Sequence, residues 1–259
     1  MGYIGQRRHL KRTNAPKSYG LAKMGGVFAI KHQAGPHSSK MSIPLTYLLR
    51  HNLKFAENNQ EVSRIMKKRI IKVDNQIRSS YKFPVGLMDI LTVADRNYLV
   101  SYDSQGRFAL LKLGQDQAQT KLLKVTKKYT SLGKVPMIQT HNGQNIRYPH
   151  PMIKLNDTVK YDIKTNKIVE IYPMKIGQTV MAINGNNAGR IGNLIHTDSQ
   201  GCHHFATVRD SRNNTFVTKI ENILVVGDDK GPCCPVHKDS GIRLNHIERR
   251  NKTLALNTD

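Results

Sequence analysis

The sequence predicts an α+β chain, mainly β, that is divided into several small modules. Two stretches between Ser42 and Arg69 carry apolar residues at helical spacing, whereas most of the chain after Phe83 carries short strand-like runs separated by turn residues. Hydrophobic residues make up 38% of the 259 residues and aromatic residues only 6%, so several modest cores are expected rather than one large core. We expect a basic N-terminal extension, a helix–helix–hairpin module, a central β-barrel-like module, an SH3-like barrel and a C-terminal tail at residues 1–41, 42–107, 108–174, 175–227 and 228–259.

The first helix of the helix–helix–hairpin module is expected at residues 42–58. Ser42 lies just upstream of it, and Pro44 falls in the first turn, where a missing amide hydrogen costs nothing. The buried stripe of this helix consists of Leu45, Leu48, Leu49, Leu53 and Ala56. Arg50 and Lys54 lie four residues apart, which places both cations on the outer side.

The second helix is expected directly after Asn59, whose side chain can accept a hydrogen bond from the first free helix amides. Its apolar face consists of Val62, Ile65 and Met66. A second face carries Arg64, Lys67 and Lys68. Three cations at this spacing repel one another, and only Glu57 and Glu61 are near enough in sequence to offset them. The face is therefore expected to bind an external anion; the alternative is an ordinary solvated helix.

A hairpin is expected after this helix, because the hydrophobic period changes to that of a strand after Arg69. Asp74 and Asn75 form its two-residue turn, since both residue types tolerate positive φ. The hairpin also carries the cations Lys72 and Arg78, and residues 83–93 are expected to complete its small sheet.

The charge of the chain indicates a polyanionic partner. Lys and Arg number 41 against 18 Asp and Glu, which gives a formal charge of +23 and a pI near 10.1, and nucleic acid is the usual partner of such a protein. A membrane surface is the rival partner, but no apolar run approaches the ~18 residues of a spanning helix. The start of the chain lacks the pattern of a secretion signal, and glycine and proline interrupt any presequence-like helix, so we expect a cytoplasmic protein.

The N-terminal extension carries most of the unbalanced charge. Residues 1–56 contain no Asp or Glu and ten cations, among which Arg7, Arg8, Lys11, Arg12 and Lys17 are candidate phosphate contacts. One interpretation is a disordered solubilising tail. The other is an arm that docks on a structured surface, because its apolar residues are too many to leave solvated: Tyr19, Leu21, Met24, Val27, Phe28 and Ile30.

The strands after residue 97 are short and numerous, as in a small barrel or folded sheet. Ser104-Gln105-Gly106 joins two of them, and further strands are expected at residues 121–126, 135–140, 158–163 and 167–171. Between these strands, Arg147 and Tyr148 are suited to contact a phosphate and a base; equally, their segment is an edge strand locked by prolines.

The third module contains a glycine-rich hairpin. Residues 180–183 and 190–195 read as two strands around a loop that ends in Gly189-Arg190-Ile191-Gly192, and three more strands follow. This pattern resembles the KOW motif, whose loop often lies on RNA. The tail after residue 228 adds further cations, including Arg243, and apolar residues that can pack on a neighbour: Ile242, Leu244, Ile247 and Leu254.

The chemistry of an enzyme or metal site is not visible in the sequence. Cys202-His203-His204 and Cys233-Cys234 with His237 lack Cys-x-x-Cys spacing, so loop residues without a metal are expected. No βαβ alternation or phosphate-binding glycine–lysine loop occurs, and no space remains for a separate catalytic domain. The scattered acids Asp89, Asp95 and Asp103 read as solvated or capping residues. We therefore expect no enzyme activity, no cofactor and no small-molecule substrate.

Helix, helix and hairpin together resemble the RNA-binding domain named for ribosomal protein S-four. Across the whole chain, the motifs also occur in the order seen in the eukaryotic and archaeal small-subunit ribosomal protein four family, the e-type: residues 8–12, 26–29, 35–37, 61–62, 106–109, 146–149, 154–158, 189–192 and 241–244. Departures from the family are local: Asn75 stands where Gly is usual in the turn, His150 where an acid is usual, and the Cys-His loops are unfamiliar.

The resemblance implies a structural protein of the small ribosomal subunit. It would bind the five-prime domain of small-subunit ribosomal RNA beside neighbouring small-subunit ribosomal proteins, away from membranes, with nucleolar passage during assembly if the source is eukaryotic. The expected RNA-binding residues are Arg7, Arg8, Lys11, Arg12, Lys17, Arg50, Lys54, Arg64, Lys67, Lys68, Arg69, Lys72, Arg78, Arg147, Arg190 and Arg243. We expect residues 1–40 to be mobile until they fold on RNA. The alternatives are a free KOW-type RNA-binding regulator and an RNA-modifying enzyme.

Overall fold

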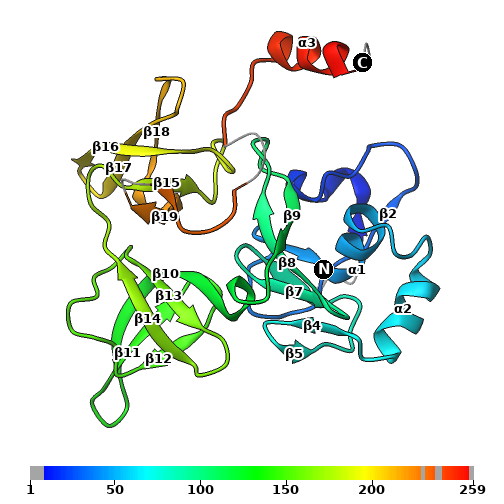
Figure 1. Cartoon of the computed structure of the whole chain (residues 1–259), viewed down its shortest axis with the longest axis horizontal. Coiled ribbons are helices and arrows are strands. Elements are labelled where there is room, and N and C mark those ends of the chain that lie inside the picture. The colour runs from blue at the N-terminus through cyan, green and yellow to red at the C-terminus, as the bar shows by residue number, and fades with distance from the viewer. Residues whose placement is uncertain (1–8, 229–230, 237–240, 257–259) are drawn as a thin grey trace, which may run out of the picture.

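The protein is built from three successive β modules with short helices. In the computed structural model, the described residues are 9–228, 231–236 and 241–256. They form two sheets of five strands and one of six, together with two-stranded pairs (Figure 1). The helices are α1 (Leu45–Tyr47), α2 (Asn59–Lys67) and α3 (His246–Leu256). The predicted α+β, mainly β, class is confirmed.

The first helix is shorter than the predicted span of residues 42–58. Ser42–Pro44 is the strand β3, which pairs with β6 (Pro84–Gly86), and α1 then continues as the π-helix η3 (Leu48–Asn52). The chain turns out of the helix at Lys54, which has a φ of 55°. Arg50 stabilises the loop that follows, because its guanidinium donates hydrogen bonds to the backbone carbonyl of Glu57 and to Asn59 Oδ1.

Helix α2 has the predicted amphipathic character but a different cap. Val62 and Met66 are buried and Ile65 is half-buried, as their spacing predicts. The prediction of an Asn59 cap is wrong: Asn58 occupies the N-cap without a side-chain hydrogen bond, and the Asn59 amide oxygen is held by Arg50. Instead, the Glu61 carboxylate accepts a hydrogen bond from the Glu57 amide at 2.8 Å, which holds the loop before the helix against its first turn.

The hairpin after α2 begins the first large sheet. Asp74 and Asn75 both have positive φ, 50° and 62°, which confirms the predicted two-residue turn. The strands of this sheet are β4 (Ile71–Val73), β5 (Gln76–Ile77), β7 (Ile90–Val93), β8 (Arg96–Tyr102) and β9 (Phe108–Leu113), in the order β5-β4-β7-β8-β9. The sheet therefore extends to Leu113, beyond the boundary expected at residue 107.

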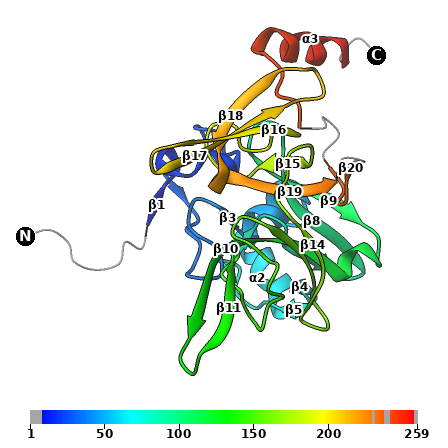
Figure 2. The ribbon, with the colours of Figure 1, turned by 90° about the vertical axis from the view of Figure 1, so that its left-hand side faces the viewer.

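The central module is organised around one long strand. β10 (Thr120–Ser131) pairs along its first half with β13 (Thr158–Asp162) and along its second half with β11 (Val135–Thr140), with a register shift at residues 125–127. The edge strands are β12 (Asn145–Arg147) and β14 (Lys167–Tyr172). The far end of the β10–β11 hairpin projects away from the body (Figure 2).

The third module is an antiparallel sheet with a tail. Its strands are β15 (Thr179–Ala182), β16 (Ile191–Gln200), β17 (His203–Arg209), β18 (Thr215–Lys219), β19 (Ile223–Asp228) and β20 (Gly231–Pro232). Helix α3 lies at the edge of this module, where Arg212 of the β17–β18 turn donates to Glu248 at 3.4 Å (Figure 2). Ile247 and Leu254 are accordingly exposed, and only Ile242 and Leu244 of the predicted packing residues are half-buried.

The described part of the N-terminal arm forms short elements that pack on the body, and its mobility before RNA binding stays a prediction. β1 (Leu10–Lys11) pairs with β2 (Phe28–Ala29), and two 3₁₀ turns, η1 (Arg12–Asn14) and η2 (Lys17–Tyr19), lie between them. Tyr19 is buried. Three of the apolar arm residues nevertheless remain exposed: Met24, Val27 and Phe28.

The hydrophobic interior consists of two clusters rather than one per module. The larger cluster runs from the arm and the first sheet into the third module, and includes Tyr19, Leu48, Val62 and Val225. The smaller cluster fills the central module and includes Leu123, Val125 and Tyr161. The first and third modules thus share a core, so their relative position is fixed by packing.

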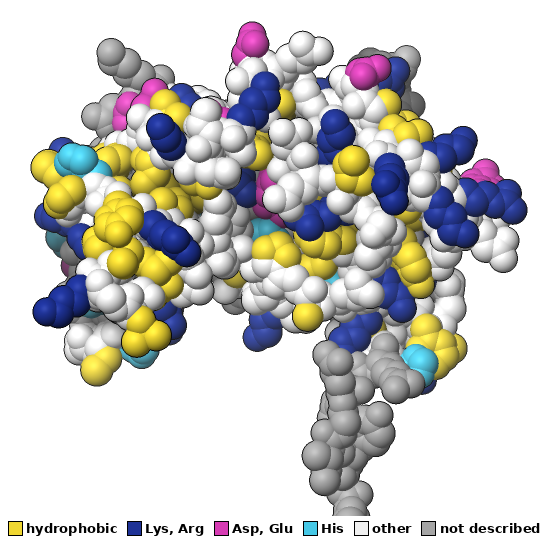
Figure 3. Space-filling view, turned by 90° about the horizontal axis from the view of Figure 1, so that it is seen from below, with side chains coloured by type: hydrophobic (Ala, Val, Ile, Leu, Met, Phe, Trp, Pro, Cys, Tyr) yellow, Lys and Arg dark blue, Asp and Glu magenta, His cyan; other side chains and the backbone are white. Residues whose placement is uncertain are grey.

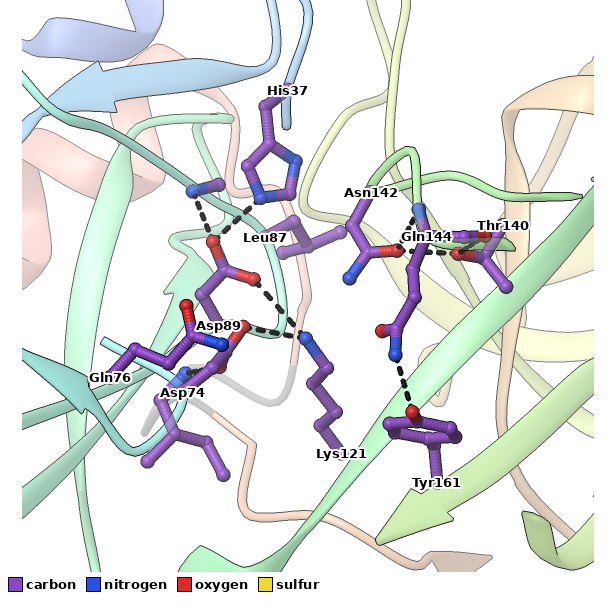
Figure 4. Close-up of polar contacts among 12 residues, drawn as sticks. His37, Asp74, Gln76, Leu87, Asp89, Lys121, Thr140, Asn142, Gln144 and Tyr161 are labelled. Carbon is purple, nitrogen blue, oxygen red and sulfur yellow. Dashed lines mark hydrogen bonds and ion pairs between the residues drawn. The ribbon is translucent and has the colours of Figure 1, made fainter. Parts of the chain in front are cut away.

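A buried ionic cluster joins the arm, the first sheet and the central module (Figure 4). His37 Nε2 lies 2.6 Å from Asp89 Oδ2, and Lys121 Nζ lies 2.6 Å from Asp74 Oδ2 and 3.9 Å from Asp89 Oδ1. The Gly86 amide also donates to Asp89. Burial opposes ionisation of Asp89, yet adjacent His37 and Lys121 hold the pKa of this carboxyl below its usual range. Asp89 is therefore an ion-pair residue, contrary to the prediction of an unpaired acid.

A buried lysine joins the central and third modules. Lys124 Nζ donates hydrogen bonds of 2.8 Å to the carbonyl oxygens of Ile220 and Glu221, in the turn that precedes β19. Its side chain is fully buried. Burial lowers the pKa of Lys124 to about 7. A buried amino group is costly without hydrogen bonds, and the two carbonyls supply them.

The ionic cluster leaves no space for a side chain on Gly86. A Cβ at this position would lie 2.3 Å from His37 Nδ1, so Gly86→Ala must displace the imidazole from Asp89. We expect this change to lower the free energy of unfolding by about 1–3 kcal/mol, measured by urea denaturation. Gly114→Ala is the matched control, because its Cβ would meet nothing within 4 Å. Equal losses of stability in the two variants would show that the His37 side chain does not restrict residue 86.

Asp74 gives the cluster a pH dependence with a defined sign. Burial, with the Asp89 charge adding to it, raises the pKa of Asp74 to about 6, although Lys121 opposes the shift. The folded protein therefore keeps a proton that the unfolded chain has released, so this group makes stability fall as pH rises from about 4 to about 6. We expect the free energy of unfolding of Asp74→Asn, measured by urea denaturation, to decline less than that of the wild type between pH 4 and pH 6. Parallel pH profiles would count against the assignment.

Candidate nucleic-acid interface

The cations at the end of α2 form an open basic surface. Arg64, Lys67, Lys68 and Arg69 are exposed, and none of them takes part in an ion pair between described residues. Glu61 is turned toward the Glu57 amide. The negative C-terminal end of the helix dipole favours these cations. They nevertheless repel one another, so a bound anion would stabilise them.

The cations that flank α2 are held more firmly. Arg78 donates to Gln76 Oε1 at 2.6 Å and its guanidinium carbon lies 4.4 Å from the centre of the Phe83 ring. Arg50 is fixed by its two bonds to the loop at residues 57–59. Lys72 on β4 is half-buried, and Lys54 is exposed at the end of the first helical segment. Arg50 and Arg78 are therefore fixed by contacts within the protein, whereas Lys54 is open to solvent.

The cations of the arm divide into organising and exposed residues. Arg12 donates to the carbonyls of Ala22 and Gly25, at 2.6 and 3.0 Å, and so holds the arm's loop together. Lys11 Nζ lies 4.2 Å above the Phe28 ring, and Lys17 is exposed. Arg7 and Arg8 lie outside the described residues.

Arg147 and Tyr148 lie on the edge strand of the central module. β12 is the last strand in its sheet, in agreement with the edge-strand interpretation of this segment. Tyr148 follows with a φ of 50°, its amide donates to the Pro136 carbonyl at 3.0 Å, and its side chain is 71% exposed. The backbone thus presents an aromatic ring beside the exposed Arg147, an arrangement that also suits stacking on a base.

Arg190 of the glycine-rich loop points inward. Its guanidinium donates to Asp210 Oδ2 at 2.5 Å and lies 3.9 Å from the centre of the Phe216 ring. Gly189 packs so closely on the first module that a Cβ would lie 1.9 Å from the Asp103 carbonyl oxygen. Arg243 from the tail is exposed and donates to the Asn186 carbonyl at 2.5 Å. The loop is therefore packed between the first module and the tail.

The structure separates the predicted residues into distinct surfaces. The α2 group lies at the opposite side of the molecule from β12 with Arg147 (Figure 1). Seen from below, Lys and Arg side chains are spread over this face and gather densely at the edge where α2 lies, whereas acidic side chains are sparse (Figure 3). Arg243 and the arm form a third area, next to the glycine-rich loop.

Sequence reasoning missed the residues whose roles depend on burial. Lys121 and Lys124 lie on the strand predicted at residues 121–126, and nothing near them in sequence identifies Asp89 or Ile220 as partners. Lys31 and Lys40 were not predicted as site residues, although both line a cavity with Lys17 and Arg243.

The described residues contain neither a cluster of candidate metal ligands nor a helix that could span a membrane. Cys202 and Cys233 are exposed, Cys234 is half-buried, and no cluster of three His, Cys, Asp or Glu suited to a metal occurs in the described residues. His237 lies outside them. Among the described helices, none is long and apolar enough to span a bilayer.

Comparison with known proteins identifies the family. The chain matches three family models: the RS4NT (NUC023) domain at residues 4–40, ribosomal family S4e at residues 94–168, and the 40S ribosomal protein S4 C-terminus at residues 210–257. It is 37% identical to the small ribosomal subunit protein eS4 of Lysiphlebus testaceipes over 97% of both chains. Identity to the eS4 protein of Ixodes scapularis is 38%, over 96% of this chain and 97% of that relative.

A solved structure supports the same assignment. The crystal structure of the 30S ribosomal protein S4e from Thermoplasma acidophilum aligns with a TM-score of 0.64 and 27% identity, and covers 74% of this chain and 98% of that chain. Because curated relatives above 30% identity extend over nearly the whole chain, the chain belongs to the ribosomal family S4e.

Proposed function

We propose that this protein is a structural constituent of the small ribosomal subunit, where it binds and stabilises the five-prime domain of the ribosomal RNA. The observation that carries the proposal is the unpaired basic surface at the end of α2 in a chain whose relatives are named small ribosomal subunit proteins. The formal charge of +23 supports it, because such a field is neutralised by a polyanion.

Binding would act through phosphates rather than base sequence. Each phosphate neutralised by Lys or Arg releases counterions, and structured RNA is recognised mainly by its shape and backbone. We assign the open contacts to exposed cations of the α2 surface, the arm, the central edge strand and the tail: Lys11, Lys17, Lys54, Arg64, Lys67, Lys68, Arg69, Arg147 and Arg243. The internally bonded Arg12, Arg50, Arg78 and Arg190 would set the shape of these surfaces, with half-buried Lys72 beside them.

The finer expectations follow from the same proposal. The first module would be an S-four-type RNA-binding domain and the third a KOW-type barrel, with neighbouring small-subunit ribosomal proteins as further partners. The protein would act in cytoplasmic ribosomes, without catalysis, cofactor, metal, membrane or small-molecule substrate. The exposed helix α3 offers a surface for protein neighbours.

The α2 surface gives a direct mutational test. Replacing Arg64, Lys67 and Lys68 together by Gln should weaken binding to a small-subunit ribosomal RNA transcript and make the plot of log affinity against log salt shallower by roughly 2–3. Fluorescence anisotropy across a salt series measures both, and urea denaturation should find unchanged stability because the three side chains are exposed.

The control for this variant removes three exposed cations elsewhere, Lys164, Lys167 and Lys219. It has the same change in net charge, so a comparable loss in both variants would show that only overall charge matters. Unchanged binding and normal subunit assembly in the α2 variant would show that this surface is merely solvated.

Sedimentation distinguishes a structural component from a free factor. We expect the tagged protein to stay with washed small subunits at near one copy per subunit, because a structural component is held by many contacts at once. Quantitative immunoblotting across a sucrose gradient measures this. Complete release into the soluble fractions would favour the free RNA-binding regulator or the RNA-modifying enzyme instead.

A further inference from the structure

A cavity lies where three parts of the chain meet. The N-terminal arm, the β8–β9 turn and the loop at residues 183–188 of the third module enclose a volume of about 830 Å³. We call it the junction cavity. Its volume lies within the range of about 300–1,000 Å³ that is typical of small-molecule sites.

The walls of the junction cavity are fixed by close backbone contacts. A Cβ on Gly106 would lie 3.1 Å from the Ala188 carbonyl oxygen, and Gly189 is packed against Asp103 in the same turn. Arg243 ties the tail to this loop through the Asn186 carbonyl. The cavity is therefore formed by the docked modules.

The lining of the junction cavity is cationic. Lys17, Lys31, Lys40 and Arg243 come from well-separated positions in the sequence, and no Asp or Glu is among the lining residues. Cations gathered in a concave site raise the local potential, since low-dielectric walls focus the field. The cavity thus favours an anion.

Some residues on the arm side of the cavity also have buried polar atoms without partners within the described structure. The Tyr19 side chain lines the cavity and is only 7% exposed, yet its hydroxyl has no hydrogen-bond partner within the described structure. Ser18 Oγ and His32 Nε2, on residues that also line the cavity, are unpartnered in the same sense. By contrast, the neighbouring Tyr47 hydroxyl accepts a hydrogen bond from the Ile30 amide at 2.7 Å. Buried polar groups without partners cost about 1–3 kcal/mol each.

We propose that the junction cavity binds the phosphate of a nucleotide. Lys17, Lys40 and the remaining N–H groups of Arg243 supply positive charge, and the Tyr19 hydroxyl donates a hydrogen bond once the arm residues around it move aside for the ligand. The phosphate comes either from a nucleotide of the ribosomal RNA that is turned out of its stack or from a free nucleotide. The first source rests on the proposed function, whereas the second does not.

Tyr19→Phe tests the proposal with the smallest change. The free full-length variant should be at least as stable as the wild type in urea, because it loses only an unsatisfied buried hydroxyl. Its affinity for a small-subunit ribosomal RNA transcript, or for adenosine monophosphate if that is the ligand, should fall roughly tenfold, as for one lost hydrogen bond to a charged group. Tyr47→Phe is the control: it should lower stability, since Ile30 loses its acceptor, but leave the affinity of the folded protein unchanged.

Lysine acetylation read by mass spectrometry separates the two ligand sources. In full-length protein, Lys17 and Lys40 should be protected by the RNA transcript or by adenosine monophosphate, and exposed Lys164 should not. Protection by RNA alone assigns the site to ribosomal RNA, and protection by the nucleotide assigns it to a free ligand. The proposal is overturned if neither probe changes the labelling of the two lysines and Tyr19→Phe binds with wild-type affinity. If wild-type protein still binds the transcript, only the cavity inference fails; if it does not, the proposed function fails too.

Discussion

The fold depends on the buried contact between His37, Asp89 and Lys121. These three residues come from the arm, the first sheet and the central module, so one cluster of charges sets the relation between three parts of the chain. Breaking a buried ion pair by removing one partner typically costs about 3–5 kcal/mol, because the other charge stays buried and uncompensated. The cluster therefore acts as a specificity device: only the docked arrangement satisfies all of its members. Lys124 extends the same principle to the third module.

Docking of the modules separates the basic side chains into a buried group and an open group. Lys121 and Lys124 lie inside the protein and are satisfied there, whereas the cations at the end of α2 stay open. The described arm carries the β1–β2 pair and packs the buried Tyr19 against the larger hydrophobic cluster. The molecule thus presents separate basic surfaces, which suits a component that must fit structured RNA at several points.

Local features were predictable from the sequence, and long-range features were not. The turn at Asp74 and Asn75 and the apolar face of α2 depend on residues a few positions apart, so pattern alone identifies them. The early end of the first helix, the pairing of His37 with Asp89 and the inward position of Arg190 depend on partners remote in sequence. The candidate surfaces were likewise predicted by residue type, but the junction cavity appears only when the arm and the glycine-rich loop are brought together.

The central claim is that the open basic surface of this rigid body faces ribosomal RNA. The most direct measurement is ultraviolet cross-linking in purified small subunits, with the linked peptides and nucleotides both identified by mass spectrometry. We predict cross-links within residues 64–69 and within the described arm, all to nucleotides of the five-prime domain. Cross-links confined to other faces of the protein, with Arg64, Lys67 and Lys68 freely modified in intact subunits, would contradict the account.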